Sequence, residues 1–302
     1  MMREAFFERG FVVRDTTVSK QMHPYCYLIP VLLIYLVLFI LPTLMSFFFS
    51  LTVWTLSDYT FVGLENFKMF ISEDSLRIGI KNTMIYAVMT SSLKVILALF
   101  VAVFLTSGLR TQNFLRSMVF FPNLVSTLAV GLTFSSLMHP TRGVFNAFLG
   151  KLGVEGPDWL GNVHLALFSI VAVDVWKGLG VATVIYLAGL QAIPKDYYEA
   201  SSIDGASKRQ NFLHITLPLI RPSMNSVIIL SFIGGMRSFD LIWAMTKGGP
   251  GFTTDVVSSI VYKQYANGYY GLSIAGNVIM FLLIALFAFP LYRFLIKREA
   301  SL

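Results

Sequence analysis

Long runs without charge are the feature of this sequence that most restricts its fold. Residues 25–51 contain no Asp, Glu, Lys or Arg over 27 positions, and about 20 apolar residues are enough for a helix to cross the hydrocarbon core of a bilayer. A secretory signal peptide has an apolar region of only about 7–15 residues, followed by a small-residue cleavage site, and neither condition is met here. We therefore interpret residues 25–51 as an uncleaved first membrane span.

Five further runs are nearly free of charge, so six spans are expected, at about 25–51, 82–107, 114–138, 163–190, 223–246 and 272–296. Helices are the expected form, because lipid offers no partner for an open backbone. Strands of a membrane barrel would alternate in character over about 10 residues, and these runs are longer and evenly apolar. The sequence predicts an all-α integral membrane protein with a six-helix domain at 25–296, between an N-terminal arm at 1–24 and a tail at 297–302.

The Lys and Arg residues indicate how the chain is oriented. If the N-terminus is cytoplasmic, the inner segments carry 13 of them and the outer segments 7, while Lys94, Lys177 and Arg237 lie within spans. Basic residues concentrate on the cytoplasmic side of membrane proteins, so we expect both termini to be cytoplasmic. The net charge of +7 therefore reflects topology, and no nucleic-acid partner is expected because the basic residues form no patch.

The loop at residues 191–222 differs from the other connections, because it is long and combines charge with an amphipathic pattern. Pro194 suits the first position of a helix, and Gly205 suits its C-terminal cap. A second helical stretch is expected from about residue 207 to 217, stopping at Pro218. A simple connector could be much shorter, so this loop is expected to contact a partner.

The same loop resembles the cytoplasmic signature of permease subunits from binding-protein-dependent ABC importers. That signature reads E-A-A, three residues, G, nine residues, then I-x-L-P. Here the sequence has Glu199-Ala200-Ser201, then Gly205 preceded by Asp204, then Ile215-Thr216-Leu217-Pro218. Ser201 is the single departure, one small residue in place of another. Weaker similarity to the sugar-permease branch, in particular to its larger maltose-type partner, lies at residues 61–67, 82–83, 143–146, 159–160, 176–178, 239–242 and 246–250.

The resemblance implies a type I importer permease of a bacterial or archaeal cytoplasmic (inner) membrane. Its partners would be a second, related permease in a heterodimer, two ATP-binding subunits and an extracytoplasmic solute-binding protein. Coupling to the ATPase would be carried by Glu199, Ala200, Ser201, Asp204, Gly205, Ile215, Leu217 and Pro218. This chain has no G-x-x-x-x-G-K-[ST] phosphate loop, so ATP and Mg²⁺ are expected on the ATP-binding subunits. No cofactor, metal or catalytic role is expected on this chain.

Polar and aromatic residues inside the spans are candidates for the substrate pathway, since such polar groups are costly in lipid and a sugar needs apolar faces with a few fixed polar groups. The candidates are Trp176, Lys177, Tyr186, Arg237, Phe239, Asp240, Trp243 and Asn277. Other interpretations stay open. Asp174 with Lys177, and Arg237 with Asp240, are spaced to neutralise each other on a helix. Trp243 could be an interfacial anchor, and Gly178, Gly180, Gly234 and Gly235 could allow close helix contact.

A carbohydrate, an oligosaccharide in particular, is the cargo that the resemblance implies, delivered by the binding protein and taken up at the expense of ATP. Two alternatives remain at this stage. An acidic sugar such as a uronate oligomer would explain the intramembrane Arg237. A secondary transporter driven by an ion gradient is less favoured, because such proteins often carry inverted repeats and no motif occurs twice here.

Overall fold

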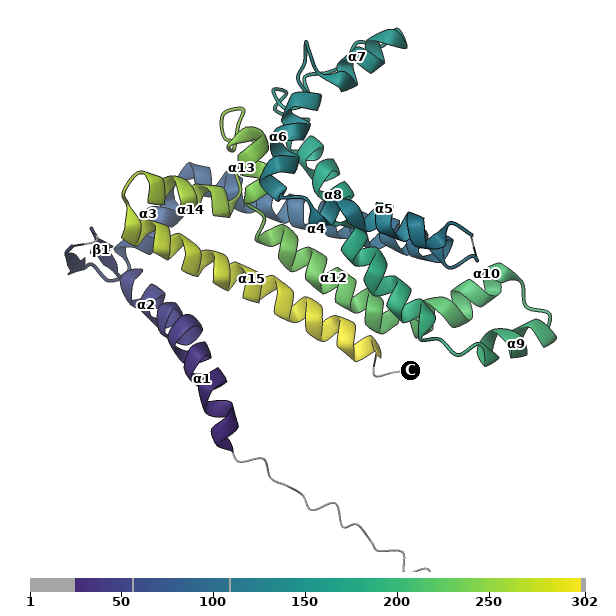
Figure 1. Ribbon diagram of the computed structural model, residues 1–302. Coiled ribbons are helices and arrows are strands. Elements are labelled where there is room, and N and C mark those ends of the chain that lie inside the picture. Colours follow the sequence, from purple (N-terminus) through teal and green to yellow (C-terminus); the bar gives the residue numbers. More distant parts are fainter. Residues whose placement is uncertain (1–24, 56, 109, 300–302) are drawn as a thin grey trace, which may run out of the picture. The chain divides into compact units, whose positions relative to one another are not determined.

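The computed structural model describes residues 25–55, 57–108 and 110–299, and these are mostly helical (Figure 1). The expected arm at 1–24 and the last residues of the expected tail, 300–302, lie outside the described residues. Contacts divide the chain into one unit that ends at Met45 and a second that begins at Ser46. Each unit is described by itself.

The first span is a helical run from Ile29 to Phe49, 21 residues long. A short 3₁₀ turn, η1 (Tyr25–Leu28), precedes it, and the run itself consists of α1 (Ile29–Tyr35), a π-helical turn, η2 (Leu36–Ile40), and α2 (Leu41–Phe49). The π turn comes just before Pro42, which lacks the N–H that an α-helix requires at that position. At about 1.5 Å per residue the run is about 32 Å long, enough to cross a bilayer core.

Four long helices form the frame of the second unit: α4 (Asp74–Leu105), α8 (Ala166–Gln191), α12 (Arg221–Met236) and α15 (Tyr270–Glu299). Glycine allows two of the close approaches. A Cβ on Gly235 would lie 2.7 Å from Cα of Ala87 in α4, and one on Gly180 would lie 2.6 Å from the Val119 carbonyl oxygen. The expected role in close packing is therefore confirmed for these two residues. It does not hold for Gly234, which faces open space.

Two spans are broken rather than straight. The third consists of α5 (Gln112–Leu124) and α6 (Thr127–Leu137), whose axes are bent by 95° from one another. The bend follows Pro122, which lies inside α5 and lacks the N–H that a regular helix requires. The fifth departs from the expected single span at 223–246: α12 ends at Met236, and a separate helix, α13 (Asp240–Thr246), follows it. The Ser258 hydroxyl donates a 2.6 Å hydrogen bond to the Ser238 carbonyl, which satisfies backbone that the break exposes.

The segments expected outside contain short elements that side-chain amides and hydroxyls connect. A two-stranded antiparallel hairpin, β1 (Thr52–Trp54) and β2 (Tyr59–Phe61), precedes α3 (Glu65–Ser72). Asn66 in α3 donates to the carbonyls of Ser50 and Thr52, at 3.0 and 2.8 Å. Beyond α6, α7 (Val144–Lys151) contains Asn146, which accepts a 2.7 Å hydrogen bond from the Trp159 indole. Two segments, at residues 61–67 and 143–146, resemble the sugar permeases, and each contains an Asn whose hydrogen bonds hold its loop in place.

A further helix, α14 (Val257–Ala266), lies in the segment before the last span, where the sequence analysis expects none. Its N-terminal end is attached to α4. Asn82 donates to the carbonyls of Thr253 and Asp255, both at 2.9 Å, and Thr83 accepts from the Val257 amide. The fully buried Asp255 carboxylate pairs with Lys263 at 2.6 Å. These contacts hold α14 against the start of α4.

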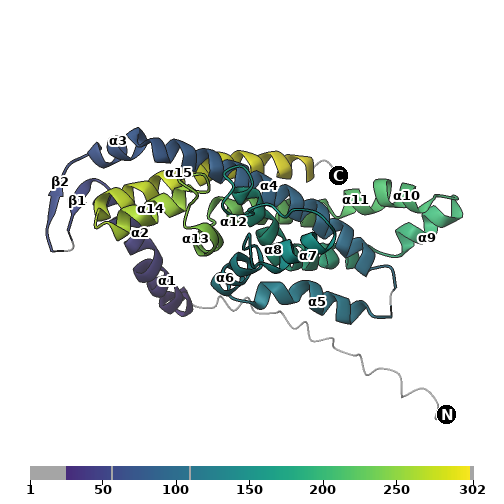
Figure 2. The same ribbon diagram turned by 90° about the horizontal axis from the view of Figure 1, so that it is seen from above.

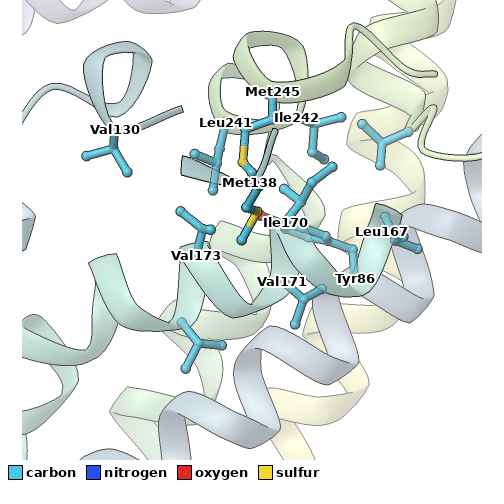
Figure 3. Close-up of a cluster of buried hydrophobic side chains, with 12 residues drawn as sticks. Tyr86, Val130, Met138, Leu167, Ile170, Val171, Val173, Leu241, Ile242 and Met245 are labelled. Atoms are coloured by element: carbon cyan, nitrogen blue, oxygen red, sulfur yellow. The ribbon is translucent and has the colours of Figure 1, made fainter. Parts of the chain in front are cut away.

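The largest of the buried apolar clusters lies where α4, α6, α8 and α13 converge (Figure 3). Its labelled side chains come from these elements and the residue that ends α6: Tyr86, Val130, Met138, Leu167, Ile170, Val171, Val173, Leu241, Ile242 and Met245. In a bilayer, where lipid is as apolar as these side chains, such close packing stabilises helix contacts through van der Waals attraction. The cluster therefore fixes the short helix α13, and the break before it, against two long spans.

Candidate functional site

The loop at 191–222, which we name the coupling element, forms a compact pair of helical segments. The first is α9 (Asp196–Ile203), and it ends at Gly205, whose φ of +75° lies in the left-handed region that glycine adopts without strain. The amide of Ala206 donates back to the Ser201 carbonyl at 2.9 Å, as in glycine-capped helix ends. The predicted glycine cap is therefore present.

The second segment begins with a capping box at Ser207, whose amide donates to the Gln210 side chain at 2.8 Å. It continues through α10 (Lys208–Asn211), a π turn, η3 (Phe212–Thr216), and α11 (Leu217–Leu219). The expected stop at Pro218 is wrong by one residue, since the segment ends at Leu219. The π turn comes just before the proline, as in the first span, and the helix continues through it.

Contacts inside the element keep its two segments together and leave one face of α9 free. The Tyr198 hydroxyl lies 2.9 Å from the Thr216 hydroxyl and ties α9 to the second segment. Glu199 and Ala200 are exposed, and Ile203 is 88% exposed. The element projects beyond the ends of α4 and α5 (Figure 2). The exposed side chains of α9 are therefore available to another subunit.

Among the intramembrane candidates, Asp174 forms an ion pair with a different lysine from the one that spacing favours. Its Oδ2 lies 2.7 Å from Nζ of Lys94, and only 12% of the lysine side chain and 21% of the aspartate side chain are exposed. Gly178 makes room for the pair, since a Cβ there would lie 2.7 Å from Cε of Lys94. The pair joins α4 to α8. Lys177 stays half-buried, with no ion pair among the described residues.

Arg237 and Asp240 lie at the break between α12 and α13. Both are exposed, and no ion pair joins them within the part of the chain that the structure describes. The break removes the regular helical spacing on which their expected pairing depends. Both side chains are therefore available to a ligand or to another subunit.

Beside the same break three aromatic rings gather. Phe239 stacks on Trp243 with ring centroids 5.6 Å apart, and Tyr262 of α14 lies 4.7 Å from Trp243 and 5.1 Å from Phe239. A hollow of about 270 Å³ adjoins them, lined by Phe239, Ser258, Val261, Tyr262, Tyr265, Ser273 and Asn277. The structure thus brings the candidates Phe239, Trp243 and Asn277 together. Sequence reasoning missed Tyr262 and Tyr265 because it did not find α14.

The remaining two candidates lie apart from this group. Trp176 is 44% exposed and its ring lies 5.2 Å from that of Phe134 in α6. Tyr186 is fully buried in a second apolar cluster with Ala98, Ala102 and Ile220. A side chain enclosed in that way has no surface for a passing solute, so we leave Tyr186 out of the pathway proposed below. No group of three metal-ligating side chains occurs among the described residues.

These elements define a multi-span helical membrane protein with a projecting coupling element. Four described helices are long and apolar enough to cross a membrane, or up to six if two bent pairs each count as one span: α5 with α6, and the helical segment Lys208–Leu219 with α12, which is bent from it by 65°. Residues 94–301 match the family described as "Binding-protein-dependent transport system inner membrane component". The chain belongs to this family and is a permease subunit of an ABC importer in the membrane. This membership decides against the ion-gradient carrier that the sequence left open.

Similar proteins are named as carbohydrate permeases. The chain is 37% identical to the trehalose/maltose transport system permease protein MalF of Thermococcus litoralis, over 87% of this chain and 90% of that protein. It is 33% identical to the arabinooligosaccharides transport system permease protein AraP of Bacillus subtilis, over 83% and 81%. A solved bacterial ABC transporter involved in the import of the acidic polysaccharide alginate has the same fold, with a TM-score of 0.76, 22% identity, and 89% and 94% coverage.

Proposed function

We propose that this chain forms one half of the pore of an ATP-driven oligosaccharide importer. The observation that carries the proposal is the aromatic hollow at the break in span five, together with the names of the relatives. Sugars bind through apolar ring faces and a small number of fixed polar groups. The rings of Phe239 and Tyr262 supply such faces in the hollow, Trp243 packs against both rings, and Asn277 and Ser258 supply polar groups at the same hollow.

In this proposal the sugar passes along a wall that includes Phe239, Trp243 and Asn277, with Arg237 and Asp240 beside it. Lys177 and Trp176 of α8 contribute further polar and aromatic surface. The Lys94–Asp174 pair has a structural role instead, because its carboxylate and its ammonium group already neutralise each other. The pathway is completed by a second, related permease, which the exposed side chains at the break would face.

The coupling element transmits the energy of ATP hydrolysis. Two ATP-binding subunits hold ATP and Mg²⁺, and this chain itself has no ATPase activity. The exposed face of α9, with Glu199, Ala200 and Ile203, rests in a groove of one ATP-binding subunit, together with Ser201 and Asp204. Gly205 turns the chain into the second segment, where Ile215, Leu217 and Pro218 connect it to span five. Closure of the ATPases then moves this lever as a rigid body.

A second candidate cargo is an acidic oligosaccharide such as a uronate oligomer. It is favoured by Arg237, which is exposed at the break and forms no ion pair within the described part of the chain. A guanidinium group binds carboxylates through two parallel hydrogen bonds. Arg237→Gln should therefore impair uptake of a uronate oligomer more than uptake of a neutral one.

The assembly is tested first. The tagged chain is solubilised gently from native membranes, and co-purifying proteins are identified by mass spectrometry. Recovery of a second permease and an ATPase is expected. A chain that purifies alone or as a homodimer contradicts the proposed assembly.

The cargo is tested with the recovered complex and its binding protein in proteoliposomes, using labelled neutral and acidic oligosaccharides. Uptake should require ATP inside and should be unaffected by a protonophore. Trp243→Ala should reduce uptake of the transported sugar, whereas Phe148→Ala, which removes an exposed ring on α7 far from the break in sequence, is the matched control. Equal uptake by both variants argues against the aromatic hollow.

A further inference from the structure

A second hollow, of about 600 Å³, lies at the inner end of the second unit, between the spans and the coupling element. It is lined by the last turns of α4 and α8, the first turns of α5, and the two coupling segments. The lining residues are Val103, Thr106, Gln112, Arg116, Leu190, Gln191, Ile193, Lys195, Tyr198, Lys208, Asn211, Phe212 and Thr216. Neither the coupling contact nor the sugar pathway uses this hollow.

The charge of the lining is of one sign. Arg116, Lys195 and Lys208 are the charged residues in it, with no Asp or Glu, and none of the three has an ion pair within the described part of the chain. Like charges that face one hollow repel each other. An anion bound between them would remove this repulsion.

Two buried polar atoms in the lining have no hydrogen-bond partner among the described residues: Nε of Arg116 and Oδ1 of Asn211. The first is a donor and the second an acceptor. An unsatisfied buried group costs about 1–3 kcal/mol, so a ligand that pairs with both atoms would stabilise this end of the second unit. That ligand would offer an anionic acceptor to Arg116 and a hydroxyl or similar donor to Asn211.

The hollow also lies at the depth of membrane headgroups. α4 has 32 residues and is therefore about 48 Å long, longer than the hydrocarbon core of about 30 Å. The span expected from the sequence ends at residue 107, so the last turn of α4, which lines the hollow, is expected in the headgroup region. Basic pockets between spans on the cytoplasmic side bind phospholipid headgroups.

We propose that this hollow binds a phosphate group that carries a hydroxyl-bearing substituent, such as the phosphoglycerol headgroup of an anionic lipid. The phosphate lies among Arg116, Lys195 and Lys208, and a hydroxyl donates to Asn211. The ligand bridges α5 and both coupling segments, so it stiffens the joint between the lever and the spans. A soluble phosphate compound offers the same chemistry, and the experiment separates the two sources.

The test uses the purified whole transporter and counts bound lipid by native mass spectrometry. Samples come from nanodiscs of phosphatidylcholine alone or with phosphatidylglycerol. The wild type should retain phosphatidylglycerol. Arg116→Gln and Lys208→Gln should each weaken its binding by about fivefold or more, the effect of losing one cation near an anionic headgroup. Arg209→Gln is the matched control, because it removes the next cation along α10 without touching the hollow.

Competition with inorganic phosphate and with glycerol phosphate identifies the source. Loss of bound lipid at millimolar glycerol phosphate assigns the hollow to a soluble phosphate compound, and indifference to it assigns the hollow to the lipid. Equal retention of phosphatidylglycerol by Arg116→Gln, Lys208→Gln and Arg209→Gln, with no protection by either phosphate compound, overturns the proposal. So does a cross-link from Lys208→Cys to an acidic segment of another subunit, which would show that a protein fills the hollow.

Discussion

The ion pair between Lys94 and Asp174 joins two spanning helices, and its loss should destabilise the permease by an amount that the structure bounds. Nζ and Oδ2 are 2.7 Å apart, with 12% and 21% of the two side chains exposed. Removing one partner of a fully buried pair costs about 3–5 kcal/mol, because a charge stays behind without compensation. The residual exposure here reduces that figure to about 2–3 kcal/mol for Asp174→Asn or Lys94→Met.

The double variant is the decisive one. Lys94→Met with Asp174→Asn leaves no buried charge, so it should cost no more than either single change, about 2 kcal/mol or less. Simple addition of the single effects would give about 4–6 kcal/mol instead. Stability is measured by reversible unfolding in mixed micelles, followed by tryptophan fluorescence. Additivity within about 0.5 kcal/mol would refute the reasoning, since it would mean that the two charges do not interact.

Gly178 gives an independent check of the same pair. A Cβ at this position would lie 2.7 Å from Cε and 2.9 Å from Nζ of Lys94, so Gly178→Ala should push the ammonium away from Asp174. The control is Gly234→Ala, where a Cβ meets nothing within 4 Å and the better helix propensity of Ala favours the variant by about 1 kcal/mol. Loss of stability in the first variant only is expected, and in a Lys94→Met background Gly178→Ala should cost nothing further, because no ammonium is left to displace.

Four further outcomes are expected. Gly205→Val should lower ATP-dependent uptake by about tenfold, because a β-branched residue is strained at φ +75°. Gly205→Asn should retain most of the uptake, and equal uptake by the Val and Asn variants contradicts this prediction. Ile203→Glu should reduce recovery of the ATPase with the tagged chain, and Ser202→Glu, at an exposed neighbour, should not. Trp243→Ala should raise the KM for sugar by about 3- to 10-fold, with little change in the amount of ATPase subunit that co-purifies with the tagged chain. Asn82→Ala, which removes two hydrogen bonds to loop carbonyls, should cost about 2 kcal/mol in the unfolding assay; a cost near zero would mean that the loop is held otherwise.

The spans and the coupling element could be predicted because the forces that determine them are local or come from the solvent. Lipid requires about 20 uncharged residues in a helix, and residues 25–51 satisfy that requirement without reference to the rest of the chain. Gly205 and Ser207 are end signals that act within one helical turn. The structure has both signals, and its α4 and α8 overlap the predicted second and fourth spans.

The ion-pair partner of Asp174 could not be predicted from spacing. Lys177 lies three residues away and Lys94 lies 80 residues away, so a local rule favours the wrong lysine. The choice depends on how closely α4 approaches α8, which Gly178 permits. The helix α14 was missed for a related reason: its ten residues are too few for a span, and its N-terminal end is held by hydrogen bonds with the distant residues Asn82 and Thr83.

The polar residues of the spans fall into two groups, and the distinction has a functional consequence. Lys94 and Asp174 neutralise each other inside the second unit, so they are stable in lipid without any other subunit. Arg237 and Asp240 are exposed at the break in span five, which Ser258 stabilises by its bond to the Ser238 carbonyl. Exposed charges at membrane depth are tolerated beside water or a partner. The break is therefore the surface where the proposed pathway or the proposed second permease would lie, and Phe239 and Trp243 are beside it.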